Sequence, residues 1–127
     1  MLKTLLLTFF TLLSLQAREI NLNTLNTQAL KQNKHLFVFL HRTDCGYCDS
    51  MLQFTFDDDK VTPLLENAFL FVHINIFDED SVTYKSFKGN GRAFAKHIGY
   101  NVYPTSLFFD AHNTLIYAAA GYRDEKD

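Results

Sequence analysis

The chain has 127 residues, enough for one domain, and 47% of them are hydrophobic, which predicts a packed core and excludes extensive disorder. Its net charge of -2 argues against a nucleic-acid partner that is held through phosphate neutralisation. Two cysteines are too few to scaffold a disulfide-rich mini-protein, and 13 Phe with 6 Tyr instead predict an aromatic core.

The first 17 residues are typical of a signal peptide. Met1–Lys3 is a short basic start, and the apolar stretch Thr4–Leu15 is shorter than the roughly 20 residues of a membrane span. The tripeptide Leu15-Gln16-Ala17 then ends in a small residue, so we predict cleavage after Ala17 and a single domain over residues 18–127. The mature protein is then expected in the periplasm or another oxidising, extracytoplasmic compartment. The alternative is an uncleaved N-terminal membrane anchor.

The mature chain begins with a predicted helix and a predicted strand. Apolar residues recur on one helical face, at Leu22, Leu25, Ala29 and Leu30. Asn23 or Thr24 is the expected N-cap, and the helix should end near Asn33. The unbroken apolar run Leu36–Leu40 predicts a buried strand.

The sequence Cys45-Gly46-Tyr47-Cys48 follows this strand and contains both cysteines of the chain. Apolar residues at helical spacing continue to Phe56, so Cys45 is expected at the exposed start of a helix and Cys48 on its inner face. Free backbone N–H groups and the helix dipole favour thiolate at such a position. This arrangement predicts thiol–disulfide exchange in which Cys45 attacks and Cys48 resolves the mixed disulfide.

The expected loop 41–44 before the cysteines carries charges of both signs. His41 and Arg42 add positive charge near Cys45, whereas Asp44 opposes a second negative charge. Their net effect on the pKa of Cys45 is left open, and so is the alternative that they are solvated loop residues. His73, in a later strand, is interpreted as a core histidine in preference to a proton carrier.

The middle of the chain predicts a helix and a strand. The three aspartates Asp57–Asp59 are interpreted as a helix cap, since they lack the spacing of a calcium loop. The helix covers residues 61–68, with Pro63 in its first turn, and the strand covers 69–76.

The later elements are predicted mainly from their turn residues. They are a possible edge strand at 82–87, a turn at 89–91, a helix over 92–98 ended by Gly99, and a strand hairpin formed by 106–109 and 115–120. Alternating strands and helices followed by a hairpin predict an α/β fold, with a parallel core and an antiparallel ending.

With these elements in order, the chain resembles the thioredoxin superfamily. The resemblance is carried by residues 37–40 leading to the two cysteines, by the strand 72–76, and by Gly99–Thr105 before the hairpin. It implies a thioredoxin fold, a central mixed β-sheet flanked by helices. It also implies a cis Tyr103–Pro104 bond, with Tyr103, Pro104 and Thr105 contacting substrate beside Asp44, Gly46 and Tyr47 of the active-site loop.

Within the superfamily, the chain is most similar to small periplasmic thioredoxins of the SoxW type, through Lys88–Gly91, Leu107–Asp110 and the signal peptide. The tetrapeptide Cys-Gly-Tyr-Cys is similar to that of the disulfide isomerase DsbC.

Two departures from the family pattern stand out. Phe39 occupies the position of the buried aspartate of thioredoxins, and His73 that of its lysine partner. The segment Gly121–Asp127 covers only about one turn of the family's last helix, so we expect that helix to be truncated, short or missing, and a missing helix would leave an apolar sheet face exposed.

The resemblance implies a monomeric oxidoreductase that reduces protein disulfides through Cys45 and Cys48. It would need no cofactor beyond this redox-active disulfide, and it would receive electrons from a membrane donor of the thiol-redox type. Oxidation or isomerisation of protein thiols is the alternative direction. A different class of function, a metal carrier, would use the two thiolates with Met51 or His41. No resident metal is expected.

Overall fold

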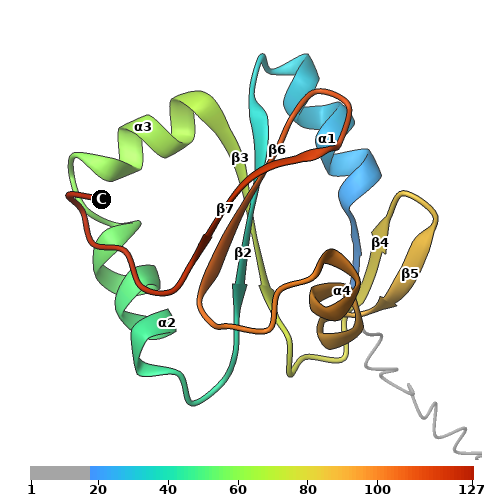
Figure 1. Cartoon of the computed structure of the whole chain (residues 1–127). Helices are drawn as coiled ribbons and strands as arrows, with labels where there is room; N and C mark the ends of the chain where they lie inside the picture. The colour runs from blue at the N-terminus through green and yellow to red at the C-terminus, as the bar shows by residue number, and fades with distance from the viewer. Residues whose placement is uncertain (1–17) are drawn as a thin grey trace, which may run out of the picture.

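The computed structural model describes residues 18–127, so the predicted signal peptide lies outside the described residues (Figure 1). The elements in chain order are β1 (Glu19–Asn21), α1 (Leu22–Lys31), β2 (His35–His41), α2 (Gly46–Ser50), the π-helical turn η1 (Met51–Thr55), α3 (Val61–Ala68), β3 (Phe69–Asn75), β4 (Ser81–Tyr84), β5 (Phe87–Asn90), α4 (Gly91–Ile98), β6 (Thr105–Phe109) and β7 (Leu115–Ala120). No helix within this part of the chain is long and apolar enough to cross a membrane.

A mixed four-stranded sheet in the order β3-β2-β6-β7 forms the centre of the fold. Strand β2 pairs in parallel with β3 and antiparallel with β6, so Phe37 lies between Phe71 and Phe108. Six consecutive residues of β2, from Leu36 to His41, are buried, as the unbroken apolar run predicts for a strand covered on both faces. The expected mixed sheet flanked by helices is confirmed.

The two faces of this sheet are covered by different helices, which lie on opposite sides in Figure 1. We call them the α1 side and the α2 side. On the α1 side, Leu36, Val38 and Leu40 join a core that includes Leu22 of α1 and Phe94 of α4. On the α2 side, Phe37 and Phe39 pack with Met51 of η1 and, at the margin, with partly buried rings and side chains that include Phe56 and Leu65. Each side takes alternate residues of β2, as strand geometry requires.

A second sheet, in the order β1-β4-β5, lies at one edge of the domain beside α4 (Figure 1). The sequence predicts one strand over 82–87 and a turn at 89–91. The strand is confirmed for residues 82–84, which lie in β4, but its predicted end and the position of the turn are wrong. The chain turns at Lys85, whose φ is 51°, and Gly89 and Asn90 belong to β5. Asn90 ends the strand because its side chain accepts a hydrogen bond from Ala93 N–H and caps α4.

The start of α1 also differs from the prediction. The N-cap is Asn21, not Asn23 or Thr24, since its side chain accepts hydrogen bonds from the backbone N–H groups of both of those residues. Within the helix Asn26 faces the core, while Leu30 is 41% exposed. Asn26 is accommodated there because its side-chain amide donates to the carbonyl of Asp110 at 2.9 Å.

The segment that follows β7, residues 121–127, forms no helix. It runs toward η1, where the hydroxyl of Thr55 donates to the carbonyl of Arg123 at 2.8 Å. The α2 side is therefore open beside β7: Tyr117 is 60% exposed, and a groove of about 290 Å³ lies between η1, α3 and this strand. The predicted exposure of an apolar sheet face is observed here.

Candidate active site

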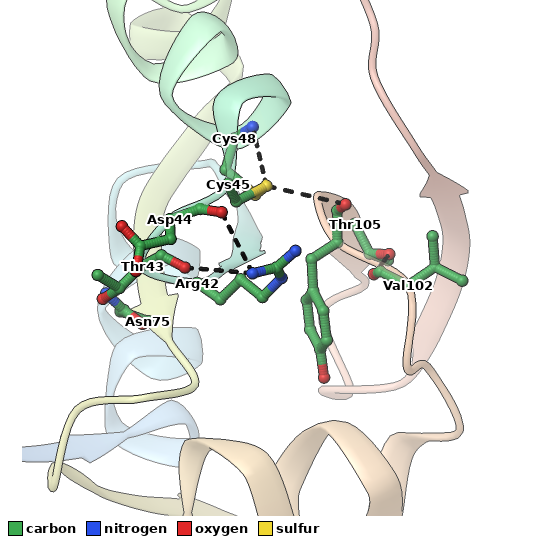
Figure 2. Close-up of a disulfide and its surroundings, with 9 residues drawn as sticks. Arg42, Thr43, Asp44, Cys45, Cys48, Asn75, Val102 and Thr105 are labelled. Atoms are coloured by element: carbon green, nitrogen blue, oxygen red, sulfur yellow. Dashed lines mark hydrogen bonds between the residues drawn. A yellow bond between two sulfur atoms is a disulfide. The ribbon is translucent and has the colours of Figure 1, made fainter.

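Cys45 and Cys48 form a disulfide at the junction between β2 and α2, with their Cα atoms 5.2 Å apart (Figure 2). Four residues connect the buried strand to the helix, and Cys45 is the N-cap of α2. The backbone N–H of Cys48 points at the Sγ of Cys45 from 3.2 Å. This N–H is one of those that the helix leaves unpaired at its start, so the predicted placement of the sulfur at a helix N-terminus is observed.

The sulfur of Cys45 is less accessible than the sequence predicts. The residue is only 5% exposed, and Cys48 is fully buried. The expectation of an exposed helix tip is wrong because the proline-containing loop lies against the sulfur: Cys45 Sγ is 3.9 Å from the carbonyl oxygen of Tyr103 (Figure 2). Of the two cysteines, Cys45 still has the only measurable exposure.

The proline loop joins α4 to β6 and contains the three residues expected to contact substrate, of which Tyr103 brings its carbonyl oxygen to the disulfide. The Tyr103–Pro104 peptide bond is cis. Pro104 and Thr105 are buried, and the hydroxyl of Thr105 donates to the carbonyl of Val102 (Figure 2). Tyr103 is half-buried, and this burial raises the pKa of its phenol, against the opposing charge of Arg92.

Arg42 supports the loop before the cysteines through hydrogen bonds. Its Nη1 donates to the carbonyls of Thr43 and Asp44, each at 3.3 Å (Figure 2). Asp44 is exposed and has a φ of 57°, in the left-handed region. Asn75 was not expected at the site, yet its side chain donates to the hydroxyl of Thr43 at 3.1 Å. The parallel pairing of β2 with β3 explains this contact, because it places the ends of both strands side by side.

His41 and His73 form a pair at the ends of β2 and β3. His41 Nε2 and His73 Nδ1 are 3.0 Å apart. His41 is the last residue of β2 and is buried, so the alternative of a solvated loop residue is wrong for it. His73 is exposed, so the interpretation as a core histidine is also wrong. It extends from an edge strand, whereas the core position of β3 is taken by Ile74.

The charge state of His41 follows from this burial. Two effects lower the pKa of His41: removal from water is the larger, and the proximity of His73 is the second. Asp78 and Asp49 raise this pKa, but their effects are smaller. His41 is therefore neutral at pH 7 and does not supply the positive charge that the sequence suggests. The neutral imidazole of His41, hydrogen-bonded to the exposed His73, can accept a proton. No carboxylate is present at position 39 for this purpose, since Phe39 is fully buried among aromatic rings.

Gly46 and Tyr47 lie between the cysteines and are both exposed, Tyr47 to 68%. The ring of Tyr47 lies 5.5 Å from that of Tyr122, centroid to centroid. Tyr122 was missed by sequence reasoning. No local pattern signals this contact, because it joins the active-site helix to the segment after the last strand.

The residues that could bind a metal remain separate. Among residues 18–127, no three His, Cys, Asp or Glu side chains come together as a potential metal site. Within these residues, a carrier of the kind considered from the sequence would have no His, Asp or Glu as a third ligand beside the two thiolates.

The fold and the paired cysteines together define a thiol–disulfide oxidoreductase of the thioredoxin type. The chain belongs to the thioredoxin-like domain family, whose family model matches residues 22–127. No curated protein matches the sequence.

Solved structures with a similar fold come from several thioredoxin-type proteins. A thioredoxin from Thermus thermophilus has a TM-score of 0.64 and 19% identity, over 87% of this chain and 79% of that one. The reduced C-terminal domain of DsbD from Neisseria meningitidis has a TM-score of 0.58 and 15% identity, over 83% and 85%. The DsbH oxidoreductase has a TM-score of 0.57 and 11% identity, over 84% and 77%. At such identities the likeness concerns the fold alone.

Proposed function

We propose that the protein is a periplasmic oxidoreductase that reduces disulfides in partner proteins, with Cys45 as the nucleophile and Cys48 as the resolving thiol. The observation that carries this assignment is the position of Cys45 Sγ at the start of α2, 3.2 Å from the backbone N–H of Cys48. A hydrogen bond from an N–H stabilises a thiolate relative to a thiol, so it favours the attacking form of Cys45.

The exchange proceeds in two substitutions at sulfur. The Cys45 thiolate attacks one sulfur of the partner's disulfide, so that a mixed disulfide forms and the other partner sulfur leaves as a thiolate. Cys48 then loses its proton and attacks Cys45 Sγ. The Cys45–Cys48 disulfide forms, the mixed disulfide breaks, and the second partner sulfur leaves as a thiolate that takes up a proton. The structure contains the oxidised end state of this sequence.

A complete cycle requires a dithiol that reduces Cys45–Cys48 again. We propose a membrane electron donor of the thiol-redox type for this role. The periplasmic location is supported by the signal-peptide pattern of residues 1–17, and the direction by the resemblance to SoxW-type thioredoxins. Because the tetrapeptide resembles that of DsbC, oxidation of protein thiols or isomerisation of protein disulfides is the alternative reaction.

Trapping of the mixed disulfide tests the two roles. Cys48→Ser should accumulate a complex between Cys45 and an oxidised protein such as insulin, visible by electrophoresis without reductant, since the resolving attack is lost. Cys45→Ser is the matched control and should accumulate much less. Equal trapping by both variants would show that the cysteines do not have distinct roles.

The direction can be measured as a reduction potential against glutathione. A value of about -270 mV supports a reductase, and a value of about -120 mV would instead identify an oxidant.

A further inference from the structure

The attack by Cys48 on the mixed disulfide requires a group that takes up the proton of its thiol. Cys48 is fully buried, and only its thiolate form is nucleophilic. Apolar surroundings favour the protonated thiol, so a proton acceptor inside the protein would assist this step. Phe39, which packs beneath the cysteine helix, has no group that accepts a proton.

His41 lies on the same side of the central sheet as Cys48 and near the same end. Helix α2 and η1 run back along β2 (Figure 1), and Met51 of η1 shares a packing cluster with Phe39. Two residues from Phe39 toward the cysteines, the ring of His41 stacks on that of Phe39, with 5.6 Å between centroids. Cys48 lies one helical turn from Met51 in the same direction. His41 is therefore placed beneath the turn that carries Cys48, and the charge of Asp49, the next residue of that turn, acts on its ring.

The pair of His41 and His73 connects this buried position to solvent. His41 is 7% exposed, whereas His73 is an exposed residue of the edge strand β3. His41 Nε2 and His73 Nδ1 are 3.0 Å apart, so a proton can pass between the two rings. This contact uses Nε2, and Nδ1 is the nitrogen of His41 that is left to take a proton from another group.

The groups around His41 keep it neutral but close to negative charge. The titratable groups that act on its ring are His73 from β3, Asp49 from α2 and Asp78 from the segment after β3. Burial and His73 lower the pKa of His41 by more than the two carboxylates raise it. A neutral imidazole in this setting can accept a proton and release it again near neutral pH.

We propose that His41 accepts the proton that Cys48 loses when it attacks the mixed disulfide, and that His73 passes a proton on to solvent. This inference rests on the proposed exchange function and assigns the proton path of its second step. The S–H bond of Cys48 breaks and the proton goes to His41 Nδ1, while the proton on Nε2 moves to His73 and from there to water. The sulfur of Cys48 bonds to Cys45 Sγ, and the partner's sulfur leaves with the electron pair of the broken mixed disulfide. When the Cys45–Cys48 disulfide is reduced again, the same path returns a proton to Cys48.

The test follows the reaction of the reduced protein with dithiobis(nitrobenzoate) by stopped-flow absorbance. Thionitrobenzoate is released first when Cys45 attacks the reagent, and again when Cys48 attacks Cys45 Sγ. The rate of the second release does not depend on the reagent concentration, so it reports the step that His41 should assist. In the wild type this rate should be constant between about pH 6.5 and 8, because His41 is neutral there, and should fall at lower pH.

His41→Gln removes the acceptor and should slow the second release by about 10²-fold near neutral pH, within the range typical of general base catalysis. The remaining rate should rise about tenfold per pH unit, with the thiolate fraction of Cys48. The first release should be unchanged. His73→Gln should slow the second release less than His41→Gln, since His41 can still accept the proton.

Two control variants separate proton transfer from packing. Phe39→Leu disturbs the contact on which His41 stacks but removes no titratable group, so its second release should stay independent of pH even where it is slower. His97→Gln removes an exposed histidine and should leave both releases as in the wild type.

The wild-type profile decides the proposal even if the His41 variant does not fold. A second release that rises about tenfold per pH unit over this range in the wild type would overturn it. A flat profile in His41→Gln, or a larger loss in His73→Gln than in His41→Gln, would also overturn it. If the wild type releases only the first equivalent of thionitrobenzoate, Cys48 does not resolve, and the exchange function fails together with this proton path.

Discussion

The two sides of the central sheet differ in how completely they are covered. On the α1 side, Leu36, Val38 and Leu40 have no exposed surface, and α1 and α4 pack over them (Figure 1). On the α2 side, Phe37 and Phe39 are also buried, but Tyr117 at the same sheet is 60% exposed and a groove runs beside it. The disulfide, the histidine pair and the Tyr47–Tyr122 pair belong to the α2 side or to its edge at the C-terminal end of β2.

This difference indicates a division of roles between the two sides. The α1 side is a closed core whose buried apolar surface stabilises the fold. The α2 side holds the helix that carries the cysteines, and part of its surface is accessible to a partner. Substitutions on the two sides should therefore separate stability from exchange activity.

The largest expected effect on stability is on the α1 side. Phe94→Ala removes a fully buried ring next to Tyr84 and should lower the free energy of unfolding by about 3–5 kcal/mol. The exchange rate per folded molecule should remain close to that of the wild type. Urea denaturation and an insulin-reduction assay measure the two quantities. Phe54→Ala, at a ring that is 68% exposed, is the control and should change stability by less than about 0.5 kcal/mol. A loss of exchange in the folded Phe94 variant would contradict the separation.

A smaller effect on stability, combined with an effect on exchange, is expected on the α2 side. Phe39→Leu keeps the position apolar but removes the edge-to-face contact with Phe56, whose centroid is 4.8 Å away. We expect a loss of about 1–2 kcal/mol and a slower exchange rate, since Phe39 packs with Met51 beneath the cysteine helix. Val38→Ala, on the α1 side of the same strand, is the comparison. If it slows exchange as much as Phe39→Leu, the two sides are not functionally distinct.

The smallest effect concerns pH. In the folded protein the pKa of His41 is lowered from its usual value of about 6.5. At pH values between this lowered pKa and about 6.5, the unfolded chain therefore binds more protons than the folded protein. The His41 contribution to stability is therefore complete above about pH 6.5 and is lost as the pH falls. His41→Gln should flatten this part of the stability profile, and His97→Gln, at an exposed histidine, should not. A profile unchanged by His41→Gln would show that the burial of His41 is not coupled to folding.

The parts of the fold that depend on local patterns were predictable from the sequence. The apolar run of β2, the helical spacing after Cys45 and the turn residue Gly99 each determine an element within a few residues. The position of Cys45 at the helix start follows from the same reasoning.

The parts that depend on long-range contacts were not predictable in this way. Asn21 is the cap of α1 because the chain enters the helix directly from β1, whose partner is β4. The exposure of His73 depends on β3 being an edge strand, and the low exposure of Cys45 on the approach of Tyr103. Tyr122 reaches the site because its neighbours are hydrogen-bonded to distant elements, Gly121 to the carbonyl of Pro104 and Arg123 to the hydroxyl of Thr55.

The most direct test of the central claim is the order in which the two cysteines react. The reduced protein is treated with a limiting amount of iodoacetamide near neutral pH, and the labelled residue is identified by mass spectrometry. Cys45 should be labelled first, because its sulfur receives the Cys48 N–H and the residue is 5% exposed, whereas Cys48 is fully buried. Labelling of Cys48 first, or of both cysteines at equal rates, would contradict the assignment of Cys45 as the nucleophile.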